Sequence, residues 1–449
     1  MGRLFGTDGV RGIANKELTP ELAFKVGRAG AYVLTCETSR RAKIVVGKDT
    51  RISCDVLENA LIAGILSVGA EAVRAGVIPT PGIAYLVKNE DFDAGVMISA
   101  SHNPFEHNGI KFFSSEGYKL SDAIEERIEA IIIDDVEKTS RPTHDGLGRV
   151  YDDFSLCEKY IAYAKQTARV SLGGMKIAID CANGASSVTA EKALKALGAE
   201  VEVICNSPNG TNINKNCGST HTEAICNFVK NGNFDLGLAF DGDADRVLAI
   251  DENGVLVDGD KMMSVLALDM KKRGVLKKNT VVATVMSNLG FFIMGEENGV
   301  DIKRTKVGDR YVLEEMLSGG YSIGGEQSGH VILLDYNTTG DGLVTGIQLA
   351  CVMKETGKKL SELASVMQTY PQVLVNAKVK TENKNRYMED FEISEEIKKI
   401  ESEFSGQGRV LIRPSGTEPL VRVMIEGKDK NLIKMRAEAL AKLIESRLQ

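Results

Sequence analysis

Short apolar runs alternate with longer mixed segments along most of the chain. Runs of about five apolar residues predict buried strands, and longer segments with interspersed polar residues predict helices. Strands that alternate with helices on this scale form parallel α/β layers. Ser53 is the predicted N-cap of the first helix. The predicted strands are residues 43–47, 94–99, 175–180, 201–205, 236–240, 281–285 and 321–323, and the predicted helices are residues 53–70, 121–134, 151–168, 185–197, 261–272, 289–298 and 309–317.

The pattern changes after Tyr370-Pro371. This last part predicts a small α+β domain, joined to the rest of the chain by a short hinge. An earlier polar segment, residues 135–148, contains Pro and Gly turn signals and indicates a linker. After residue 371, strands are predicted at 373–380, 410–413 and 421–425, and helices at 394–404 and 431–447.

We therefore expect three similar α/β domains with mixed or parallel sheets, and a C-terminal α+β domain, around one central cleft. A chain of 449 residues is too long for one ordinary hydrophobic core. Each of the first three domains ends an apolar strand in a polar loop, and ligands of open α/β sheets gather at such strand ends. These loops are residues 99–104, 241–246 and 324–330, and the expected domains are residues 1–150, 151–253, 254–369 and 370–449.

Composition and charge narrow the classes of partner. A formal net charge of −7 argues against general nucleic-acid binding. The uncharged apolar run at residues 60–70 is too short to cross a bilayer, and the first residues show no apolar signal region.

The eight cysteines form no C-x-x-C pair, so neither zinc nor redox spacing is present. Cys181 lies in an apolar run and is expected in the core. We expect a cytoplasmic protein with reduced thiols and a small-molecule partner.

Three carboxylates occupy alternate positions directly after the apolar run 236–240. The residues are Asp241, Asp243 and Asp245, and the small spacers between them let the backbone curl so that the oxygens converge. Three acids at short range repel one another strongly in a low-dielectric site. A hard cation such as Mg²⁺ relieves this repulsion because it prefers oxygen ligands. The stretch predicts a metal site, with a plain acidic turn as the alternative.

An EF-hand calcium loop is a second alternative for the same stretch. The three aspartates and Glu252 stand at its first, third, fifth and twelfth positions. The sixth position, which requires Gly, is Arg246. The flanks 236–240 and 247–250 also predict strands, whereas an EF-hand requires helices. This interpretation is therefore disfavoured.

Ser101 lies just beyond the predicted strand 94–99, where its hydroxyl would be exposed. A polar turn closed by Pro104 is the alternative, and Lys111 follows seven residues later. The chain has no G-x-S-x-G elbow, so an acyl-transferring serine hydrolase is poorly supported. A phosphoryl group on Ser101 fits better, because it would supply the oxygen that the three aspartates lack as a fourth ligand.

Two further loops suggest sugar and phosphate binding. Glu326 and Ser328 are two residues apart, and together they can bracket vicinal sugar hydroxyls. In the segment 413–419, a guanidinium, hydroxyls and a flexible glycine form an anion nest, with Arg422 nearby. The absence of Walker and G-x-G-x-x-G sequences argues against nucleotide cofactors. Ordinary turns are the alternatives for both loops.

Taken together, the four loops resemble those of the α-D-phosphohexomutase superfamily over the whole chain. That family has a phosphoserine loop, a D-G-D-x-D-R metal loop, a G-E-x-S-G-H sugar loop and an R-x-S-G-T-E-P phosphate loop, in this order. The opening stretch 5–12 is also similar. Within the family, the sequence is most similar to the bacterial branch that acts on glucosamine phosphates, because it has the same residue types at Ala100, Ala244 and Gln327. One position differs from the family pattern: residue 107 is His, where an acidic residue is expected.

The resemblance implies an isomerase that interconverts glucosamine 6-phosphate and glucosamine 1-phosphate for amino-sugar nucleotide and cell-wall precursor synthesis. Phosphorylated Ser101 would give its phosphoryl group to the sugar, form glucosamine 1,6-bisphosphate, and recover the other phosphoryl group. The implied cofactors are Mg²⁺ and a priming sugar 1,6-bisphosphate. The partner is a small sugar phosphate, with no nucleic acid or membrane, and the chain is expected to be a monomer or homodimer. A metal-dependent phosphatase and a non-catalytic sugar-phosphate binder are the alternatives.

The resemblance also implies a role for each matching residue. Lys111 would act as the general base, which requires a lowered pKa. The implied catalytic residues are Ser101, Lys111, His330, Arg11, His102 and Arg246; the substrate-binding residues are Glu326, Ser328, Arg413, Ser415, Gly416, Thr417 and Arg422; and the metal ligands are Ser101, as phosphoserine, Asp241, Asp243 and Asp245.

Overall fold

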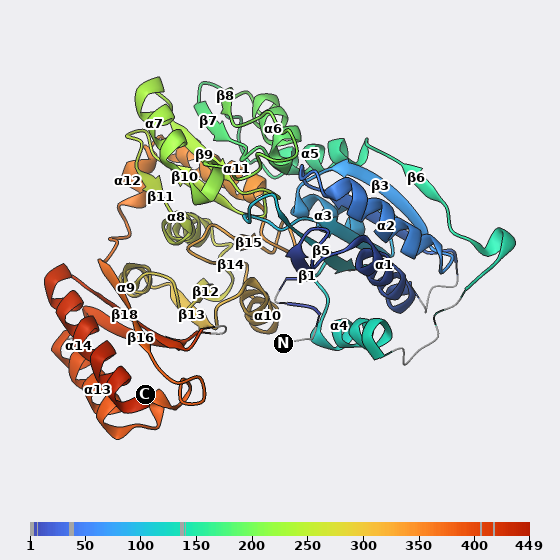
Figure 1. Cartoon of the computed structure of the whole chain (residues 1–449). Helices are drawn as coiled ribbons and strands as arrows, with labels where there is room; N and C mark the ends of the chain where they lie inside the picture. Colours follow the sequence, from blue (N-terminus) through green and yellow to red (C-terminus); the bar gives the residue numbers. More distant parts are fainter. Residues whose placement is uncertain are drawn as a thin grey trace. The chain divides into compact units, whose positions relative to one another are not determined.

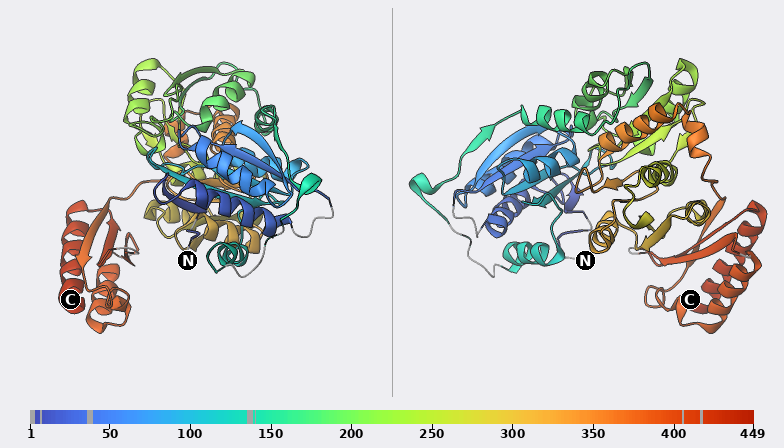
Figure 2. Two further views of the ribbon diagram at one scale, coloured as in Figure 1. Left: turned by 45° about the vertical axis from the view of Figure 1, so that its right-hand side comes forward. Right: turned by 180° about the vertical axis from the view of Figure 1, so that it is seen from behind.

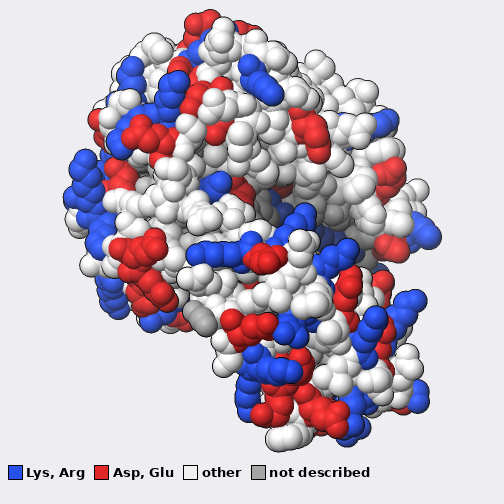
Figure 3. All heavy atoms as spheres, turned by 90° about the vertical axis from the view of Figure 1, so that its left-hand side faces the viewer, with Lys and Arg blue, Asp and Glu red and all other residues white. Residues whose placement is uncertain are grey.

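The structure is a computed structural model that describes residues 4–6, 8–35, 40–134, 139, 141–404, 406–415 and 418–449. It divides into two compact units. The first comprises Met1–Met286 and Val300–Val366, and the second comprises Ser287–Gly299 and Met367–Gln449. In the described part of the chain, no helix combines the length and apolar character that a membrane span requires. Acidic and basic side chains are interspersed over the face shown in Figure 3.

The first sheet has the strand order β1-β5-β4-β2-β3-β6. Strands β2, β3, β4 and β6 are parallel, whereas β5 runs antiparallel to both β4 and β1. Helices α1 and α2 pack against each other beside this sheet (Figure 1). The bounds are β1 Val10–Ile13, β2 Lys43–Lys48, β3 Glu71–Val77, β4 Ala94–Ile98, β5 His107–Ser114, β6 Val150–Asp152, α1 Pro20–Thr35, α2 Cys54–Leu66, α3 Thr80–Asn89 and α4 Asp122–Glu129.

The second sheet has the order β11-β10-β9-β7-β8 and the third has the order β13-β12-β14-β15. In each, parallel strands are followed by an antiparallel one, which is β10 in the second sheet and β15 in the third. The bounds are β7 Lys176–Asp180, β8 Glu200–Ile204, β9 Leu236–Phe240, β10 Val247–Ile250, β11 Leu256–Val257, β12 Thr280–Thr284, β13 Asp301–Thr305, β14 Ile323–Gly325, β15 Val331–Leu333, α5 Leu156–Gln166, α6 Ala190–Ala196, α7 Glu223–Gly232, α8 Gly259–Lys272, α10 Asp309–Gly319, α11 Gly342–Thr356 and α12 Leu360–Ala364.

The second unit contains an antiparallel sheet of order β16-β18-β17, with helices α13 and α14 on one face (Figure 2). Helix α9 belongs to this unit, where Asn288 caps it and also donates to Glu426 and the carbonyl of Tyr370. The bounds are α9 Leu289–Glu297, β16 Gln372–Lys378, β17 Gly408–Pro414, β18 Leu420–Gly427, α13 Phe391–Phe404 and α14 Lys430–Leu448.

The predicted fold class, three α/β domains followed by a smaller α+β domain, is confirmed. The grouping around one central cleft and the domain boundaries at residues 150, 253 and 369 stay predictions. Strand β6 extends the first sheet through its pairing with β3, and β11 extends the second sheet through its pairing with β10.

Several predicted elements differ in the structure. Tyr151 lies in strand β6, because its backbone pairs with β3, and the helix predicted from this residue begins only at Leu156. Helix α2 ends at Leu66, and the Ser53 side chain makes no cap hydrogen bond because it accepts one from Asn108 instead. Helix 185–197 is divided into a 3-10 turn and α6 by the non-helical backbone of Thr189. Of the predicted linker, residues 135–138 and 140 lie outside the described part.

Candidate active site

The three loops singled out from the sequence occupy equivalent places in the three α/β sheets. Each connects the last parallel strand to the antiparallel strand that follows it, namely β4 to β5, β9 to β10, and β14 to β15. The flanking pairs in the register are Ile98 with Ile110, Phe240 with Val247, and Gly325 with Val331. The loose repeat expected from the sequence is therefore a repeated hairpin, and the first unit brings side chains of all three loops into contact.

Ser101 lies in a tight bend after β4, and its backbone is left-handed with φ +52°. Its amide donates to Ser99 Oγ at 2.9 Å, which closes the bend. Its buried hydroxyl donates to Asp241 Oδ2 at 2.6 Å, across 140 positions of sequence. A strained backbone of this kind is found most often at functional sites. The bend directs the Ser101 hydroxyl at the aspartate loop, but the expectation that this hydroxyl is exposed is wrong, because the loop covers it.

Two residues that the sequence analysis did not identify, Arg51 and Asn214, hold this bend by hydrogen bonds to its carbonyl groups. Arg51 Nη2 donates to the carbonyls of Ser101 at 3.0 Å and Asn103 at 2.6 Å. Asn214 Nδ2 donates to the same two carbonyls at 2.9 and 3.1 Å. Arg51 is fully buried and forms an ion pair with Asp49. Because buried carbonyls must be hydrogen-bonded, this pair of donors fixes the position of the Ser101 bend.

The three aspartates converge as predicted. Oxygens of Asp241, Asp243 and Asp245 lie within 4.8 Å of one another, and all three residues are buried. Among the described residues, Asp243 Oδ1 and Asp245 Oδ1 have no hydrogen-bond partner. Buried unpaired oxygens in a carboxylate cluster match the preference of Mg²⁺ for hard oxygen ligands. The residues present therefore fit a divalent cation. Thr80, which the sequence did not reveal, donates to Asp243 Oδ2 at 2.6 Å.

The strands that flank the aspartate loop exclude the EF-hand. β9 and β10 pair antiparallel, from Phe240 with Val247 to Gly237 with Ile250. Glu252, which would be the twelfth ligand, instead accepts a hydrogen bond from Ser361. The loop is a strand-to-strand turn, and this geometry leaves the metal interpretation to the three aspartates.

The carboxylates differ in their ionisation because their neighbours differ. Burial, together with the charges of Asp245 and Asp243, raises the pKa of Asp241 well above its usual range. Burial acts in the same direction on Asp245, but His330, Lys111 and Arg246 outweigh it and lower the pKa of Asp245. The three carboxylates therefore repel one another, as expected for a site that binds a cation.

Lys111 lies within the site, but its electrostatic state differs from the expectation. Its Nζ is 2.8 Å from Asp243 Oδ2 and 3.0 Å from Asp8 Oδ2. Burial alone would lower the Lys111 pKa, but Asp243, Asp8 and Asp245 outweigh burial and raise it. The expected lowered pKa is therefore wrong for this state of the site, because three carboxylates surround the amine.

A chain of ion pairs extends from Lys111 to His330. Asp8 Oδ1 lies 2.6 Å from Lys119 Nζ, and Lys119 also pairs with Asp309 at the start of α10. His330 lies between carboxylates: its Nδ1 is 3.6 Å from Asp245 Oδ2, and its Nε2 is 3.6 Å from Asp309 Oδ2. Burial would lower the His330 pKa, but these two acids raise it. Lys119 and Asp309 were missed by the sequence reasoning, because they lie outside the recognised loops.

The other candidate catalytic residues line the same place. Arg11 pairs with Asp8. Arg246 Nη1 donates to His102 Nδ1 at 3.1 Å, and this nitrogen is 3.3 Å from Ser101 Oγ. Burial and the nearby charges of Arg246 and Arg11 lower the pKa of His102 to about 4, so its ring is neutral at pH 7. All six residues predicted as catalytic therefore lie in the first unit, around the Ser101 bend and the aspartate loop.

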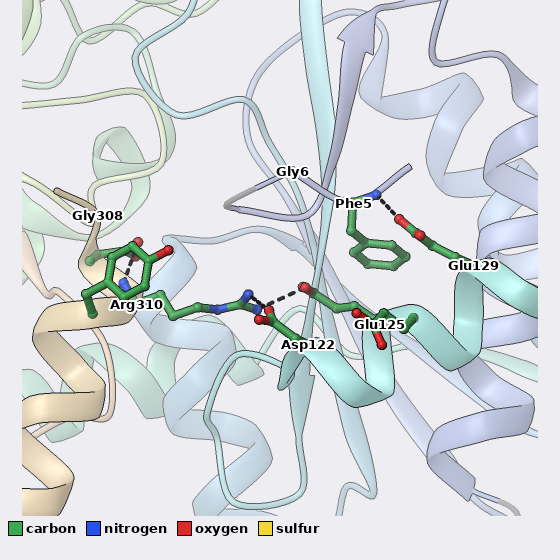
Figure 4. Close-up of a pocket in the computed structure, with 10 residues that line it drawn as sticks. Phe5, Gly6, Asp122, Glu125, Glu129, Gly308 and Arg310 are labelled. Atoms are coloured by element: carbon green, nitrogen blue, oxygen red, sulfur yellow. Dashed lines mark hydrogen bonds and ion pairs between the residues drawn. The ribbon is translucent and has the colours of Figure 1, made fainter. Parts of the chain in front are cut away.

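A pocket lies beside this network (Figure 4). It has a volume of about 210 Å³ and is lined by Phe5, by acidic residues of α4 and by the start of α10. Arg310 of α10 pairs with Asp122 and donates to Glu125 Oε2 at 2.9 Å. Glu129 Oε1 accepts the amide of Phe5 at 2.6 Å. The Arg310 contacts join α10 to α4, next to Asp309 of the ion-pair chain.

The sugar loop contacts both the third and the second sheet regions, since the Gly329 carbonyl accepts the amide of Val247 at 3.2 Å. Glu326 Oε1 accepts the amide of Gly308 at 3.2 Å, and Ser328 is exposed. Gln327 Nε2 donates to Asp258 Oδ2 at 3.1 Å, which sets the orientation of the amide. One N–H of Nε2 is used in this contact, so Gln327 can still present Oε1 as an acceptor and its second N–H as a donor.

In the second unit, the predicted phosphate loop joins β17 to β18. Arg413 and Arg422 lie directly opposite each other in this pair of strands. Like charges at opposed positions destabilise a sheet, and an anion between them relieves the repulsion. Ser415 is buried; its Oγ accepts the amide of Glu418 at 3.1 Å, and its carbonyl accepts from Lys384 Nζ at 2.8 Å. The predicted residues Gly416 and Thr417 lie outside the described residues.

Comparison with known proteins gives the same family for every part of the chain. Models of the phosphoglucomutase/phosphomannomutase family match residues 2–139 as α/β/α domain I, 158–254 as domain II, 258–370 as domain III and 374–443 as the C-terminal domain. A phosphoglucosamine mutase of Acetivibrio thermocellus is 61% identical over 448 residues, which are 100% of both chains. One of Ruminiclostridium cellulolyticum is 61% identical over 449 residues, again 100% of both.

Solved structures share the fold at low sequence identity. A phosphoglucomutase/phosphomannomutase family protein of Burkholderia thailandensis has a TM-score of 0.83 and 21% identity, over 99% of this chain and 97% of that one. The Aspergillus fumigatus N-acetylphosphoglucosamine mutase in complex with GlcNAc-6P and magnesium has a TM-score of 0.70 and 17% identity, over 99% and 96%. A variant of that enzyme in complex with glucose 1,6-bisphosphate has a TM-score of 0.65 and 16% identity, over 100% and 96%.

The match extends over the whole length of the relatives as well as of this chain, and it includes each of the four motif loops. The chain therefore belongs to the α-D-phosphohexomutase superfamily and, within it, to the phosphoglucosamine mutases, which are isomerases.

Proposed function

We propose that the chain interconverts glucosamine 6-phosphate and glucosamine 1-phosphate, with Ser101 as the carrier of the phosphoryl group. The observation that supports this most is the hydrogen bond from the Ser101 hydroxyl to Asp241, within a buried cluster that has two unpaired carboxylate oxygens. A serine with a purely structural role would not need a position in contact with a cluster of three buried carboxylates. The relatives that are 61% identical carry the same activity in their name.

Asp241, Asp243, Asp245 and phosphorylated Ser101 would hold Mg²⁺. When bound, the ion would neutralise the charge of the transferring phosphoryl group. Thr80 would keep Asp243 in place through its hydroxyl. A magnesium complex of a fold relative agrees with this assignment.

In the forward reaction, the sugar hydroxyl attacks the phosphorus, the bond from phosphorus to Ser101 Oγ breaks, and the hydroxyl proton passes to a base. Lys111 is the proposed base, since its Nζ lies within the site, beside the carboxylates of Asp8 and Asp243. It can accept a proton only after its carboxylate partners are neutralised, because they now raise its pKa. His330 would assist. Arg11, Arg246 and neutral His102 would steady the phosphoryl oxygens.

Glu326 and Ser328 would bind the sugar hydroxyls. Arg413, Ser415, Gly416, Thr417 and Arg422 would bind the phosphate that is not transferred, because opposed guanidinium groups form a site for a divalent anion. The Oε1 atom of Gln327, set by the contact with Asp258, would accept a hydrogen bond from the 2-ammonium group. A sugar 1,6-bisphosphate would prime Ser101. We place the enzyme in the cytoplasm, as a monomer or homodimer.

The decisive experiment compares the wild-type protein with the Ser101→Ala variant. Intact-mass analysis and peptide mapping of active protein should find one phosphate on Ser101. The variant should lose formation of glucosamine 1-phosphate while it keeps its circular-dichroism spectrum. Full mutase activity in Ser101→Ala would contradict the proposal. Net release of inorganic phosphate, in place of isomerisation, would indicate the phosphatase alternative, because a mutase must exclude water from the site.

A rate comparison across the 1- and 6-phosphates of glucosamine, glucose and mannose tests the substrate. We expect glucosamine phosphate to have the highest kcat/KM, glucose phosphate to be measurable, and mannose phosphate to be poorer because its 2-hydroxyl is axial. Discrimination should be partial, because a site that tolerates an added polar group rejects its analogue only weakly. Faster turnover of glucose or mannose phosphate would overturn the amino-sugar assignment, without affecting Ser101 or the metal site.

A further inference from the structure

Two cysteines outside the recognised motifs lie close together, at the two ends of the loop that carries Asn214. Cys205 follows strand β8 and Cys217 precedes a 3-10 turn, with a long loop between them. Their sulfur atoms and a carboxylate oxygen of Asp180 lie within 4.8 Å of one another. The sequence has no C-x-x-C pair, and it is chain folding that brings these two thiols together.

The two thiols differ in accessibility and in acidity. Cys205 is half-buried, whereas Cys217 is buried. The neighbouring Cys217 thiol lowers the pKa of Cys205, although burial and the Asp180 carboxylate act in the opposite direction. The neighbouring Cys205 sulfur, together with burial, raises the pKa of Cys217. The thiolate is the reactive form of cysteine, so Cys205 is the first thiol that an oxidant meets.

We propose that Cys205 and Cys217 form a modification site that closes as a disulfide when the chain meets a hydroperoxide. The Cys205 thiolate attacks the hydroperoxide, the O–O bond breaks, and Cys205 becomes a sulfenic acid while water or an alcohol leaves. Cys217 then attacks that sulfur, the S–O bond breaks, and water leaves as the S–S bond forms. Two electrons pass from the two thiols to the hydroperoxide, and a dithiol reductant reverses the reaction by exchange.

A metal site built from the same three residues is less well supported. Asp180 Oδ1 accepts the amide of Ala182 at 2.8 Å, and Oδ2 accepts the amide of Gly218 at 2.9 Å. Asn183 Nδ2 points its donor at Cys217 Sγ, at 3.8 Å. Both oxygens of Asp180 already accept hydrogen bonds from backbone amides, and the Asn183 side chain directs an N–H at the sulfur of Cys217. A closed zinc site requires four ligands, whereas this cluster offers three.

The disulfide would act on the active site through Asn214, which lies on the loop between the two cysteines. The amide of Asn214 donates to the carbonyl of Ala182 at 2.9 Å, and its side chain holds the carbonyls of Ser101 and Asn103. Bond formation brings the two sulfurs to about 2.05 Å, and any part of this approach that the backbone takes up moves the segment near Cys217. Asn214 is three residues from Cys217, and the shift would therefore move the donor that positions the Ser101 bend.

The site itself does not depend on the proposed function, so its test is chemical. Reduced protein is treated with hydrogen peroxide, and disulfides are mapped by mass spectrometry of a non-reduced digest. We expect a link between Cys205 and Cys217 that dithiothreitol reverses, and the same link in Cys226→Ser, whose substituted cysteine is also half-buried. Cys205→Ser should abolish it. Thiol oxidation without this link, or zinc retained one per chain by the two cysteines, would overturn the proposal.

Turnover measured on the same samples tests the effect on Ser101. We expect oxidation to lower kcat roughly tenfold or more in the unmodified protein and in Cys226→Ser, since displacement of a reacting group by about 1 Å has effects of this size. Cys205→Ser should keep its kcat in peroxide at the value measured before treatment. A mapped disulfide with unchanged kcat would refute the coupling through Asn214, and it would leave the modification site established.

Discussion

Replacing Gly242 by alanine measures how closely the aspartate loop must approach Ser101. A Cβ at this position would lie 2.5 Å from the Ser101 carbonyl oxygen, 2.8 Å from Ile213 Cδ1 and 2.9 Å from Asn214 Nδ2. Ordinary carbon contacts are about 3.5 Å, so the two loops must separate by roughly 1 Å. The carbonyl cannot simply retreat, because Arg51 and Asn214 both donate to it.

Two separate magnitudes follow from this displacement. Overpacking of a buried site lowers the free energy of unfolding by about 1–3 kcal/mol. A displacement of about 1 Å between reacting groups lowers the rate by on the order of 10²-fold. Because the shift separates Ser101 from the aspartates and leaves the sugar loop in place, the loss should fall on kcat and much less on KM.

The assay measures formation of glucosamine 1-phosphate in the presence of Mg²⁺ and a priming sugar bisphosphate, with urea unfolding in parallel. Gly173→Ala is the matched control, because its Cβ would meet only Ser171 Oγ, at 3.4 Å. This control should keep both kcat and stability. If Gly242→Ala kept kcat within about twofold of the unmodified protein, the close approach would not matter for phosphoryl transfer and the reasoning would be refuted.

Three further substitutions test the charges of the site. Asp243→Asn should raise the Mg²⁺ concentration for half-maximal activity about tenfold, because it removes one ligand charge; an unchanged Mg²⁺ titration would count against the metal assignment. Arg413→Lys keeps the charge but loses the bidentate fork, so substrate affinity should fall about tenfold, or roughly 1.4 kcal/mol; unchanged binding would sink this role. Lys119→Met removes the cation between Asp8 and Asp309; Asp8 keeps Lys111 and Arg11, but Asp309 loses its lysine partner, and the change should cost about 3–5 kcal/mol in urea unfolding; an unaltered midpoint would contradict the ion-pair chain.

Positions of the same residue types outside the site provide controls for the last two substitutions. Arg436 pairs with Glu403 on the second unit, and Arg436→Lys should leave substrate binding unchanged. Lys16 is exposed on the first unit, and Lys16→Met should leave the unfolding midpoint unchanged.

The chemistry of the site could be located from the sequence because each loop is contiguous. A turn after a buried strand presents Asp241, Asp243 and Asp245 from one short segment, so their convergence is a local property. Ser101 likewise follows a fully buried strand. Where local pattern was ambiguous, the prediction failed: Tyr151 pairs with β3, and such pairing depends on a distant strand. Helix α11 is buried on all sides and carries no amphipathic period, so it went unnoticed.

The ionisation of Lys111 shows where local reasoning ends. The family resemblance implied a base with a lowered pKa, whereas the structure surrounds this amine with carboxylates, which raise its pKa. Asp243 is 132 positions away along the chain, and Asp8 comes from the N-terminal segment. Nothing in the stretch around Lys111 reports these neighbours, because a Coulomb interaction depends on distance in space.

The sequence by itself determined the alternation of strands and helices, the four loops and their order, because apolar period and turn chemistry are encoded in neighbouring residues. Only the tertiary structure decided which residues support those loops. Thr80 reaches Asp243 across 163 positions, and Asn214 reaches Ser101 across 113. The pairing of Cys205 with Cys217 was equally hidden. The physical reason is that the apolar pattern specifies which face of each element is buried, whereas the strand order of the sheets and the packing between them decide which polar side chains meet.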